Sequence, residues 1–156
     1  FPGWGYWISQ GATTLWETWD GSSSRNHHMF SDISAWFYKG LAGINPDPLE
    51  PGFKHILLKP NPVEGLRWVK CKHRSMYGSI ACNWKTEGNE LIMEIEVPVN
   101  CHATLYIPKD YSKQIRKNGI SVADSDVKKV EINGGMVYIL RLGSGQDVIA
   151  ASKDEK

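Results

Sequence analysis

Apolar residues recur at every third or fourth position between residues 30 and 44, and this spacing predicts an amphipathic helix. The residues on this stripe are Phe30, Ile33, Phe37, Leu41 and Ile44. Ser31 has a side chain suited to an N-cap, and Gly40 or Gly43 can end the helix.

A shorter helical end is expected over residues 4–9, where Gly11 provides the C′ stop. Residues 11–29 follow no period and predict an irregular segment between the two helices. Five of the seven tryptophans lie in this first part of the chain: Trp4, Trp7, Trp16, Trp19 and Trp36. Because two helical ends cannot bury so much aromatic surface, we expect them to pack on elements outside this sequence.

The pattern changes at three prolines, Pro46, Pro48 and Pro51, which cannot continue a helix and favour extended or turn geometry. We interpret residues 46–52 as a linker between two parts, residues 1–45 and residues 53–152.

Beyond the linker, apolar and polar residues alternate in short runs separated by turns. The positions expected on one face of a strand are Val69, Cys71 and His73; Ile80, Cys82 and Trp84; Leu91, Met93, Ile95 and Val97; Ala103, Leu105 and Ile107; Val130 and Ile132; and Val137 and Ile139. The expected turns are residues 76–78, 87–89, 98–100, 133–135 and 143–145. An earlier strand is expected over residues 55–59. The predicted fold class is mainly β, with an antiparallel β-sandwich as the C-terminal domain.

Composition adds few constraints. The 156 residues are 41% hydrophobic and 22% charged, as in ordinary soluble proteins, and the net charge of +1 gives no field to attract nucleic acid or a membrane surface. No apolar run approaches the roughly 20 residues of a membrane helix. We therefore expect neither nucleic acid nor membrane as a partner.

The three cysteines, Cys71, Cys82 and Cys101, lack metal-ligand spacing. If the turn after Ser75 has two residues, Cys71 and Cys82 face each other across a hairpin, either as reduced core residues or as a disulfide. The compartment stays open between cytoplasm, periplasm and secretion.

One acid stands between two tryptophans in the run Trp16-Glu17-Thr18-Trp19. Aromatic rings stack on the apolar face of a pyranose, and a carboxylate can handle a proton or an activated water, so this arrangement suits sugar chemistry. By itself, Glu17 could equally be a surface acid or the partner of a buried arginine.

Other conspicuous residues near this run have structural interpretations. Asp20 can hold a loop through an Asx-turn or cap a helix, and His27 and His28 can be hydrogen-bonded loop residues. The histidine pair lacks further ligands at the spacing a zinc site needs, so no metal is expected there. Trp68 and Trp84 are expected in the core, and Trp4, Trp7 and Trp36 are expected to be core or helix-packing residues. Lys70, Lys72 and Arg74 are expected on a solvated face.

The run Gly11-Ala12-Thr13-Thr14-Leu15-Trp16-Glu17-Thr18-Trp19 resembles the end of the catalytic domain of bacterial α-L-rhamnosidases of glycoside hydrolase family 78. Further matching segments are Asn26-His27, Ala35-Trp36-Phe37-Tyr38 with Leu41-Ala42-Gly43-Ile44, Pro51-Gly52-Phe53, Ile56-Leu57-Leu58-Lys59-Pro60, and Tyr77-Gly78 with Trp84. The resemblance implies that residues 1–45 are the last helical segment of an (α/α)₆ barrel and that the sandwich packs on this upstream catalytic domain.

The resemblance also implies a reaction, the inverting hydrolysis of terminal α-L-rhamnosyl residues from a glycoside or polysaccharide, without a cofactor. Glu17 matches the general base, and His27 matches a histidine that contacts the sugar hydroxyls. Trp16 and Trp19 would help to wall the pocket. The loop 21–25 is shorter than in many relatives, which leaves the aglycone preference open.

The family's general acid lies upstream of the residues present here, and Phe1-Pro2-Gly3-Trp4 has the character of a cut inside a longer protein. We therefore expect this fragment alone to be inactive. The alternative is a non-catalytic sandwich that either binds carbohydrate or stabilises the barrel.

Overall fold

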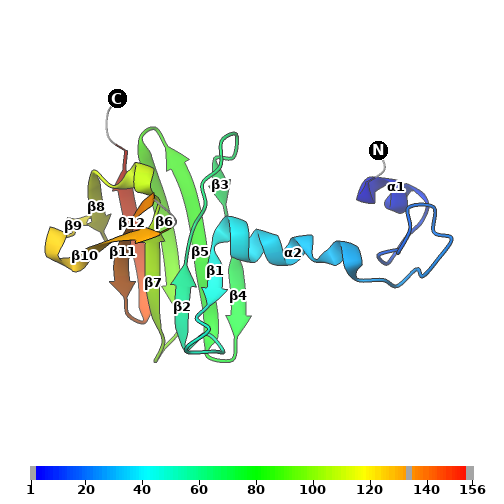
Figure 1. Cartoon of the computed structure of the whole chain (residues 1–156), viewed down its shortest axis with the longest axis horizontal. Coiled ribbons are helices and arrows are strands. Elements are labelled where there is room, and N and C mark those ends of the chain that lie inside the picture. The colour runs from blue at the N-terminus through cyan, green and yellow to red at the C-terminus, as the bar shows by residue number, and fades with distance from the viewer. Residues whose placement is uncertain (1–2, 133–134, 154–156) are drawn as a thin grey trace. The chain divides into compact units, whose positions relative to one another are not determined.

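The computed structural model of the chain describes residues 3–132 and 135–153 (Figure 1). They divide into two compact units, Phe1–Phe37 and Tyr38–Lys156. No helix in the described part of the chain is long and apolar enough to cross a membrane. Each unit is described by itself below.

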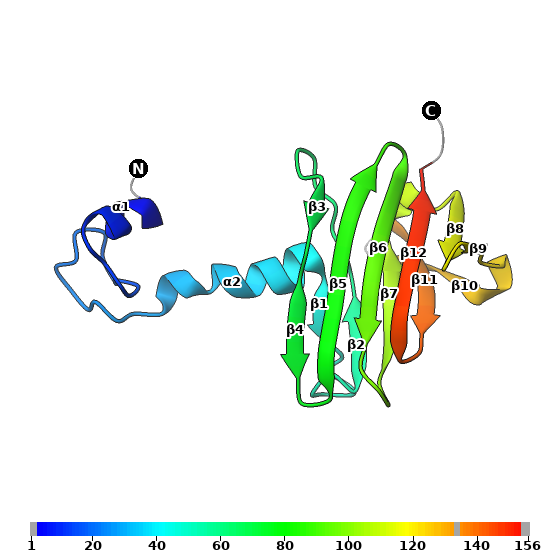
Figure 2. The ribbon, with the colours of Figure 1, turned by 180° about the vertical axis from the view of Figure 1, so that it is seen from behind.

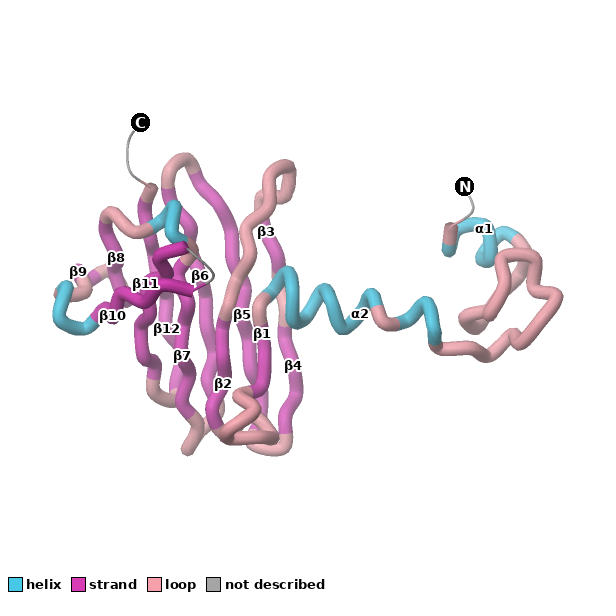
Figure 3. The backbone as a smooth tube through the Cα atoms, in the orientation of Figure 1, coloured by secondary structure: helices cyan, strands magenta, loops and turns pink. Residues whose placement is uncertain are grey.

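The first unit begins with α1 (Trp4–Ser9), which ends as the sequence predicts. Gln10 is its C-cap, and Gly11 follows in the left-handed conformation with φ of 77°. The irregular segment predicted after Gly11 is confirmed up to η1 (Met29–Ser31), and Figure 3 shows it as loop.

The predicted long helix is present but is not uniformly α-helical. It comprises η1, the α-helical turn α2 (Ile33–Trp36) and the π-helical turn η2 (Phe37–Ala42). Asp32, not Ser31, holds the N-cap position of α2, and Gly43 with φ of 87° ends the segment. η2 is a single short segment, and the spacing of four between Phe37 and Leu41 fits one turn of either kind, so the sequence could not distinguish them.

The second unit is a β-sandwich, which confirms the predicted fold class. One sheet runs in the order β1 (Ile44–Pro46), β2 (His55–Leu58), β7 (His102–Ile107), β11 (Gly135–Leu142) and β10 (Val127–Ile132). The other runs β3 (Trp68–Val69), β5 (Gly78–Glu87), β6 (Glu90–Val97), β12 (Gly145–Ser152), β8 (Gln114–Lys117) and β9 (Ile120–Ser121), with β4 (Lys72–Ser75) also paired to β5. Figure 2 shows β4, β5, β6 and β12 side by side.

Among the described residues, every strand pair but one is antiparallel. β2 and β7 run parallel, with His55 opposite His102 and Leu58 opposite Leu105. Short 3₁₀ turns, η3 (Lys109–Tyr111) and η4 (Asp124–Asp126), connect the strands that follow β7.

The core lies between the inner faces of the two sheets, where the predicted alternation is largely confirmed. Its members include Ile80, Cys82, Trp84, Leu91, Met93, Ile95, Val97, Ala103, Leu105 and Ile107. On β11 the predicted face is wrong, because Leu140 and Leu142 are buried while Val137 and Ile139 are only half-buried. The turn predicted at residues 133–135 includes residues 133 and 134, which are outside the described part.

Two further expectations concern tryptophans and cysteines. Trp68 is 60% exposed because β3 is a two-residue edge strand, so its predicted core position is wrong. Trp4 and Trp36 are also exposed within this chain, whereas Trp7 is buried. The hairpin between β4 and β5 has the two-residue turn that sets Cys71 opposite Cys82, and both thiols are free.

The end of the helical segment packs on the sandwich and is hydrogen-bonded to it. Leu41 is buried in the sandwich core, and its carbonyl accepts a hydrogen bond from Trp84 Nε1 at 3.1 Å. The Gly43 carbonyl accepts one from the Lys59 amide at 2.8 Å, and Asn61 N donates to the Leu41 carbonyl at 3.2 Å. Residues 38–46 therefore belong structurally to the second unit, and β1 includes the first residue of the proposed linker.

Candidate functional site

Glu17 lies in the loop between α1 and η1, with its carboxylate held in one orientation. Oε2 accepts hydrogen bonds from Ser23 Oγ at 2.6 Å and from the Ser24 amide at 3.2 Å. These two bonds, in that order, hold the pKa of Glu17 below its usual value, and nearby His27 adds a smaller effect in the same direction. The group is therefore ionised at neutral pH.

Backbone hydrogen bonds bring His27 to Glu17 although ten positions separate them in the sequence. The Glu17 amide donates to the Ser24 carbonyl, and the His27 amide donates to the Leu15 carbonyl, each at 2.8 Å. The chain reverses at Gly21, whose φ of 69° suits glycine. As a result His27 Nδ1 lies 4.0 Å from Glu17 Oε2.

Trp16 is buried against this reversal. A Cβ at Gly21 would lie 2.6 Å from the indole ring, so only glycine allows the chain to pass so close. The guanidinium of Arg25 lies 4.8 Å from the ring centroid, and its Nε donates to the Gly21 carbonyl at 3.0 Å. Trp16 thus supports the turn that carries Ser23 and Ser24.

Trp19 is half-buried in an aromatic cluster. Its ring centroid lies 4.5 Å from that of Trp7 and 5.0 Å from that of Phe30. Trp7 also donates through Nε1 to the Trp19 carbonyl at 3.1 Å. The packing on one side leaves the exposed part of Trp19 as the surface that a sugar could contact.

Asp20 has the geometry of the Asx-turn that its sequence context suggests. Its Oδ1 accepts from the Ser22 amide at 3.1 Å and from Ser22 Oγ at 2.8 Å, and these bonds lower its pKa. His28 is exposed and stacks on His27 with centroids 5.7 Å apart. Glu17 and His27 are thus together, with Trp16 and Trp19 packed behind the loop.

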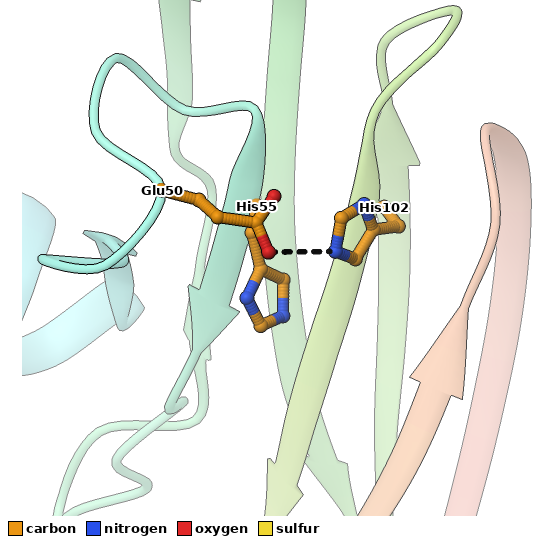
Figure 4. A group of neighbouring side chains, drawn as sticks. All are labelled: Glu50, His55 and His102. Atoms are coloured by element: carbon orange, nitrogen blue, oxygen red, sulfur yellow. Dashed lines mark ion pairs between the residues drawn. The ribbon is translucent and has the colours of Figure 1, made fainter.

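A second cluster, missed by the sequence reasoning, lies on the sandwich. Glu50, His55 and His102 place one potential metal-ligand atom each within 4.8 Å of one another, and Figure 4 shows Glu50 directed towards His102. These residues come from a loop and from two strands distant in sequence, so no spacing motif could reveal them.

Two family models match the chain. The model of the bacterial α-L-rhamnosidase 6-hairpin glycosidase domain matches residues 1–41, and that of the bacterial α-L-rhamnosidase C-terminal domain matches residues 43–120.

Curated relatives agree with these models. One α-L-rhamnosidase of Formosa agariphila is 34% identical over 127 residues, covering 74% of this chain and 14% of that protein. Another from the same organism is 31% identical over 162 residues, covering 98% of this chain and 17% of the relative. The chain therefore spans only a small part of the relatives it matches.

Two solved structures are similar over nearly the whole chain. The α-L-rhamnosidase from Dictyoglumus thermophilum aligns with a TM-score of 0.76 at 31% identity, covering 98% of this chain and 18% of that one. The Streptomyces avermitilis α-L-rhamnosidase complexed with L-rhamnose aligns with a TM-score of 0.73 at 25% identity, covering 96% and 15%.

Proposed function

The chain belongs to the bacterial α-L-rhamnosidase family, and from this premise we propose that it supplies the general base, Glu17, to the active site of a longer glycoside hydrolase. The reaction proposed for that longer protein is hydrolysis of terminal α-L-rhamnosyl residues with inversion. The substrate class follows from the relatives, one of which was solved with L-rhamnose.

The position of the ionised Glu17 carboxylate, 4.0 Å from His27 Nδ1 in the same loop, is the observation that supports this role. A general base must be ionised before the reaction, whereas a general acid needs a raised pKa to keep its proton. The hydrogen bonds from Ser23 and Ser24 favour the charged form of Glu17. Both bonds are made by Oε2, and among the described residues Oε1 accepts no protein hydrogen bond, so this oxygen is available to a water molecule.

His27 is proposed as a contact to the sugar hydroxyls. Its Nδ1 lies near Glu17 Oε2, so a hydroxyl bound by the imidazole would sit beside the base. Trp16 and Trp19 are proposed as pocket walls. Buried Trp16 supports the loop that carries Glu17, and the exposed part of Trp19 contacts the sugar.

Inversion requires a second carboxyl group, on the opposite face of the sugar and roughly 6.5–9.5 Å from the base. We assign that acid to a part of the longer protein outside this sequence. The purified 156-residue chain should accordingly show no turnover of an aryl α-L-rhamnoside, and measurable turnover would refute the assignment of the acid to another segment.

The base is tested by Glu17→Gln in the longer protein, with kcat/KM measured on an aryl α-L-rhamnoside. The amide keeps an oxygen for the Ser23 and Ser24 donors but cannot accept a proton, so a loss of roughly 10²–10⁴-fold is expected. Asp20→Asn is the matched control, since it removes the same charge from the same loop, and it should change kcat/KM by only a few-fold.

Equal losses in the two variants would contradict a specific role for Glu17 as the base. The stereochemistry is tested separately by ¹H NMR of the first rhamnose anomer released. Release of the anomer with the substrate's own configuration would rule out inversion without affecting the assignment of a rhamnosidase.

The second candidate function belongs to the sandwich, which we propose stabilises the end of the catalytic domain. The hydrogen bonds to Leu41 and Gly43 favour this role, because they hold the end of the helical segment on the sandwich core. Carbohydrate binding by the sandwich is the alternative, and exposed Trp68 would be its aromatic contact. Saturable L-rhamnose binding to the chain that is lost in Trp68→Ala would favour this alternative, whereas a purely structural role predicts that Trp68→Ala leaves any binding unchanged.

A further inference from the structure

Two histidines and a glutamate meet at one end of the five-stranded sheet (Figure 4). His55 on β2 and His102 on β7 are partners in the parallel register, and their rings stack with centroids 4.4 Å apart. Glu50 comes from the loop between β1 and β2 and places Oε1 3.7 Å from His102 Nε2. The parallel pairing thus brings together three side chains that can donate lone pairs.

His55 is oriented by a carboxylate on the side away from β7. Its Nδ1 lies 2.7 Å from Asp47 Oδ2, and an ionised carboxylate can only accept a hydrogen bond. Nδ1 therefore carries the proton of the neutral ring, and Nε2 keeps its lone pair. Nε2 faces β7, where the Thr104 hydroxyl lies 2.7 Å away and acts as donor. Histidines that bind metals are commonly oriented in this way through the other ring nitrogen.

Asp47 is itself fixed and charged. Its Oδ1 accepts a hydrogen bond from the Leu49 amide at 2.9 Å, while its Oδ2 lies 2.7 Å from His55 Nδ1. Both oxygens of the carboxylate are therefore in use, and this holds Asp47 in the orientation that positions His55.

The cluster is open to solvent and carries the charge that a cation requires. The side chains of Glu50 and His102 are 46% and 49% exposed, so an ion can enter and retain water ligands. Asp47 and Glu50 contribute two negative charges, and Arg141, which lines the same pocket of about 440 Å³, offsets one of them. One net negative charge and two imidazoles remain.

We propose that His55, His102 and Glu50 bind a divalent transition-metal ion of the zinc class, with Asp47 as the residue that positions His55. Two imidazole nitrogens and one carboxylate oxygen form a ligand set that suits Zn²⁺, and water can fill the open position. The Thr104 hydroxyl leaves Nε2 when the metal binds. The ion joins the loop between β1 and β2 to β7, and because it binds only the folded arrangement it stabilises the sandwich.

The test is an isothermal calorimetric titration of the metal-free, 156-residue chain with Zn²⁺ alone. Near-UV circular dichroism establishes that each variant is folded. We expect one saturable site per chain and a melting temperature that rises with zinc concentration. His102→Gln and Glu50→Gln each remove a ligand and should weaken binding at least tenfold. Asp47→Asn should weaken it about 10–100-fold, as found for residues that orient metal ligands.

Two further variants separate this site from adventitious binding. Thr104→Val removes the hydroxyl that competes for His55 Nε2 and should tighten binding by about 2–10-fold, the equivalent of one net hydrogen bond. His28→Gln is the matched control, since it removes an exposed histidine from the other unit and should leave affinity and melting temperature unchanged.

Absence of saturable zinc binding to the folded chain would overturn the proposal. So would wild-type affinity in folded His102→Gln, or binding that is lost in His28→Gln. These outcomes are independent of the proposed hydrolase role, which rests on Glu17 and is measured by rhamnoside hydrolysis.

Discussion

Gly43 joins the helical segment to β1, and we expect Gly43→Ala to destabilise the sandwich strongly. Its φ of 87° lies in the left-handed region, where an L-residue costs about 1–2 kcal/mol. The added methyl would also lie within 3.0 Å of the backbone of Lys59 and Pro60. Backbone atoms cannot rotate away as a side chain can, so the neighbouring strand has to move.

That movement carries its own cost. Lys59 donates its amide to the Gly43 carbonyl at 2.8 Å, so separating the two backbones strains this bond. Overpacking of this kind costs about 1–3 kcal/mol. The sum for Gly43→Ala is therefore about 2–5 kcal/mol. Gly65→Ala is a matched control, because Gly65 has a similar φ of 84° but nothing within 4 Å of its Cβ position.

The two variants are compared by urea unfolding followed with far-UV circular dichroism. Gly65→Ala should lose about 1–2 kcal/mol from backbone strain alone, and Gly43→Ala should lose about 1–3 kcal/mol more. With a slope of about 1–3 kcal/mol per molar urea, this difference moves the midpoint by on the order of 1 M. Coincident midpoints for the two variants would refute the argument that contact with the Lys59 backbone dominates.

Two other predictions concern ionisable groups of the sandwich. Burial raises the pKa of the Cys82 thiol to about 12, so the reactive thiolate is scarce at pH 8. Iodoacetamide should therefore modify half-buried Cys71 first and leave Cys82 unmodified until the chain unfolds. Peptide mass spectrometry measures the order of modification, and equal rates at the two cysteines would contradict the prediction. The lowered pKa of Asp47 stabilises the fold above the unfolded-state pKa, and this contribution is lost as pH falls through the folded-state pKa. Asp47→Asn should therefore be less stable than wild type at pH 7, and the two stabilities should converge as the pH drops below about 4, the ordinary pKa of aspartate. Urea titrations from pH 7 to 3 measure this, and a pH-independent difference would show that the charge is not responsible.

The sandwich was largely predictable because its strongest strands alternate cleanly. Leu91, Met93, Ile95 and Val97 are all buried, as their period of two requires. β12 was missed because Val148, Ile149, Ala150 and Ala151 form a continuous apolar run without alternation, although only alternate members are buried.

The residue type alone could not predict that Trp68 is exposed. Large apolar residues are usually buried, but a two-residue strand at the edge of a sheet has few neighbours to cover an indole. On β11, Val137 and Ile139 share their face with Arg141, which is exposed, whereas Leu140 and Leu142 lie on the buried face. Leu140 pairs with Leu105 of β7, and Leu142 with Ala103.

The two candidate sites differ in how far apart their residues lie in the sequence. Glu17 and His27 lie within one loop, so two short segments close in sequence point to them. The ionisation of Glu17 also depends on the serine contacts, which only the fold supplies. Glu50, His55 and His102 meet through the β2–β7 pairing, which no local pattern encodes.

The parallel pairing of β2 with β7 also constrains the order in which the chain can fold. During synthesis from the N-terminus, β2 emerges long before β7, and until then only the short hairpin with β1 is available to it. Isolated hairpins are marginally stable in water, and contacts between distant segments form slowly. The end of the helical segment, which the hydrogen bond between Gly43 and Lys59 holds at the end of β2, therefore becomes fixed only after β7 has been made.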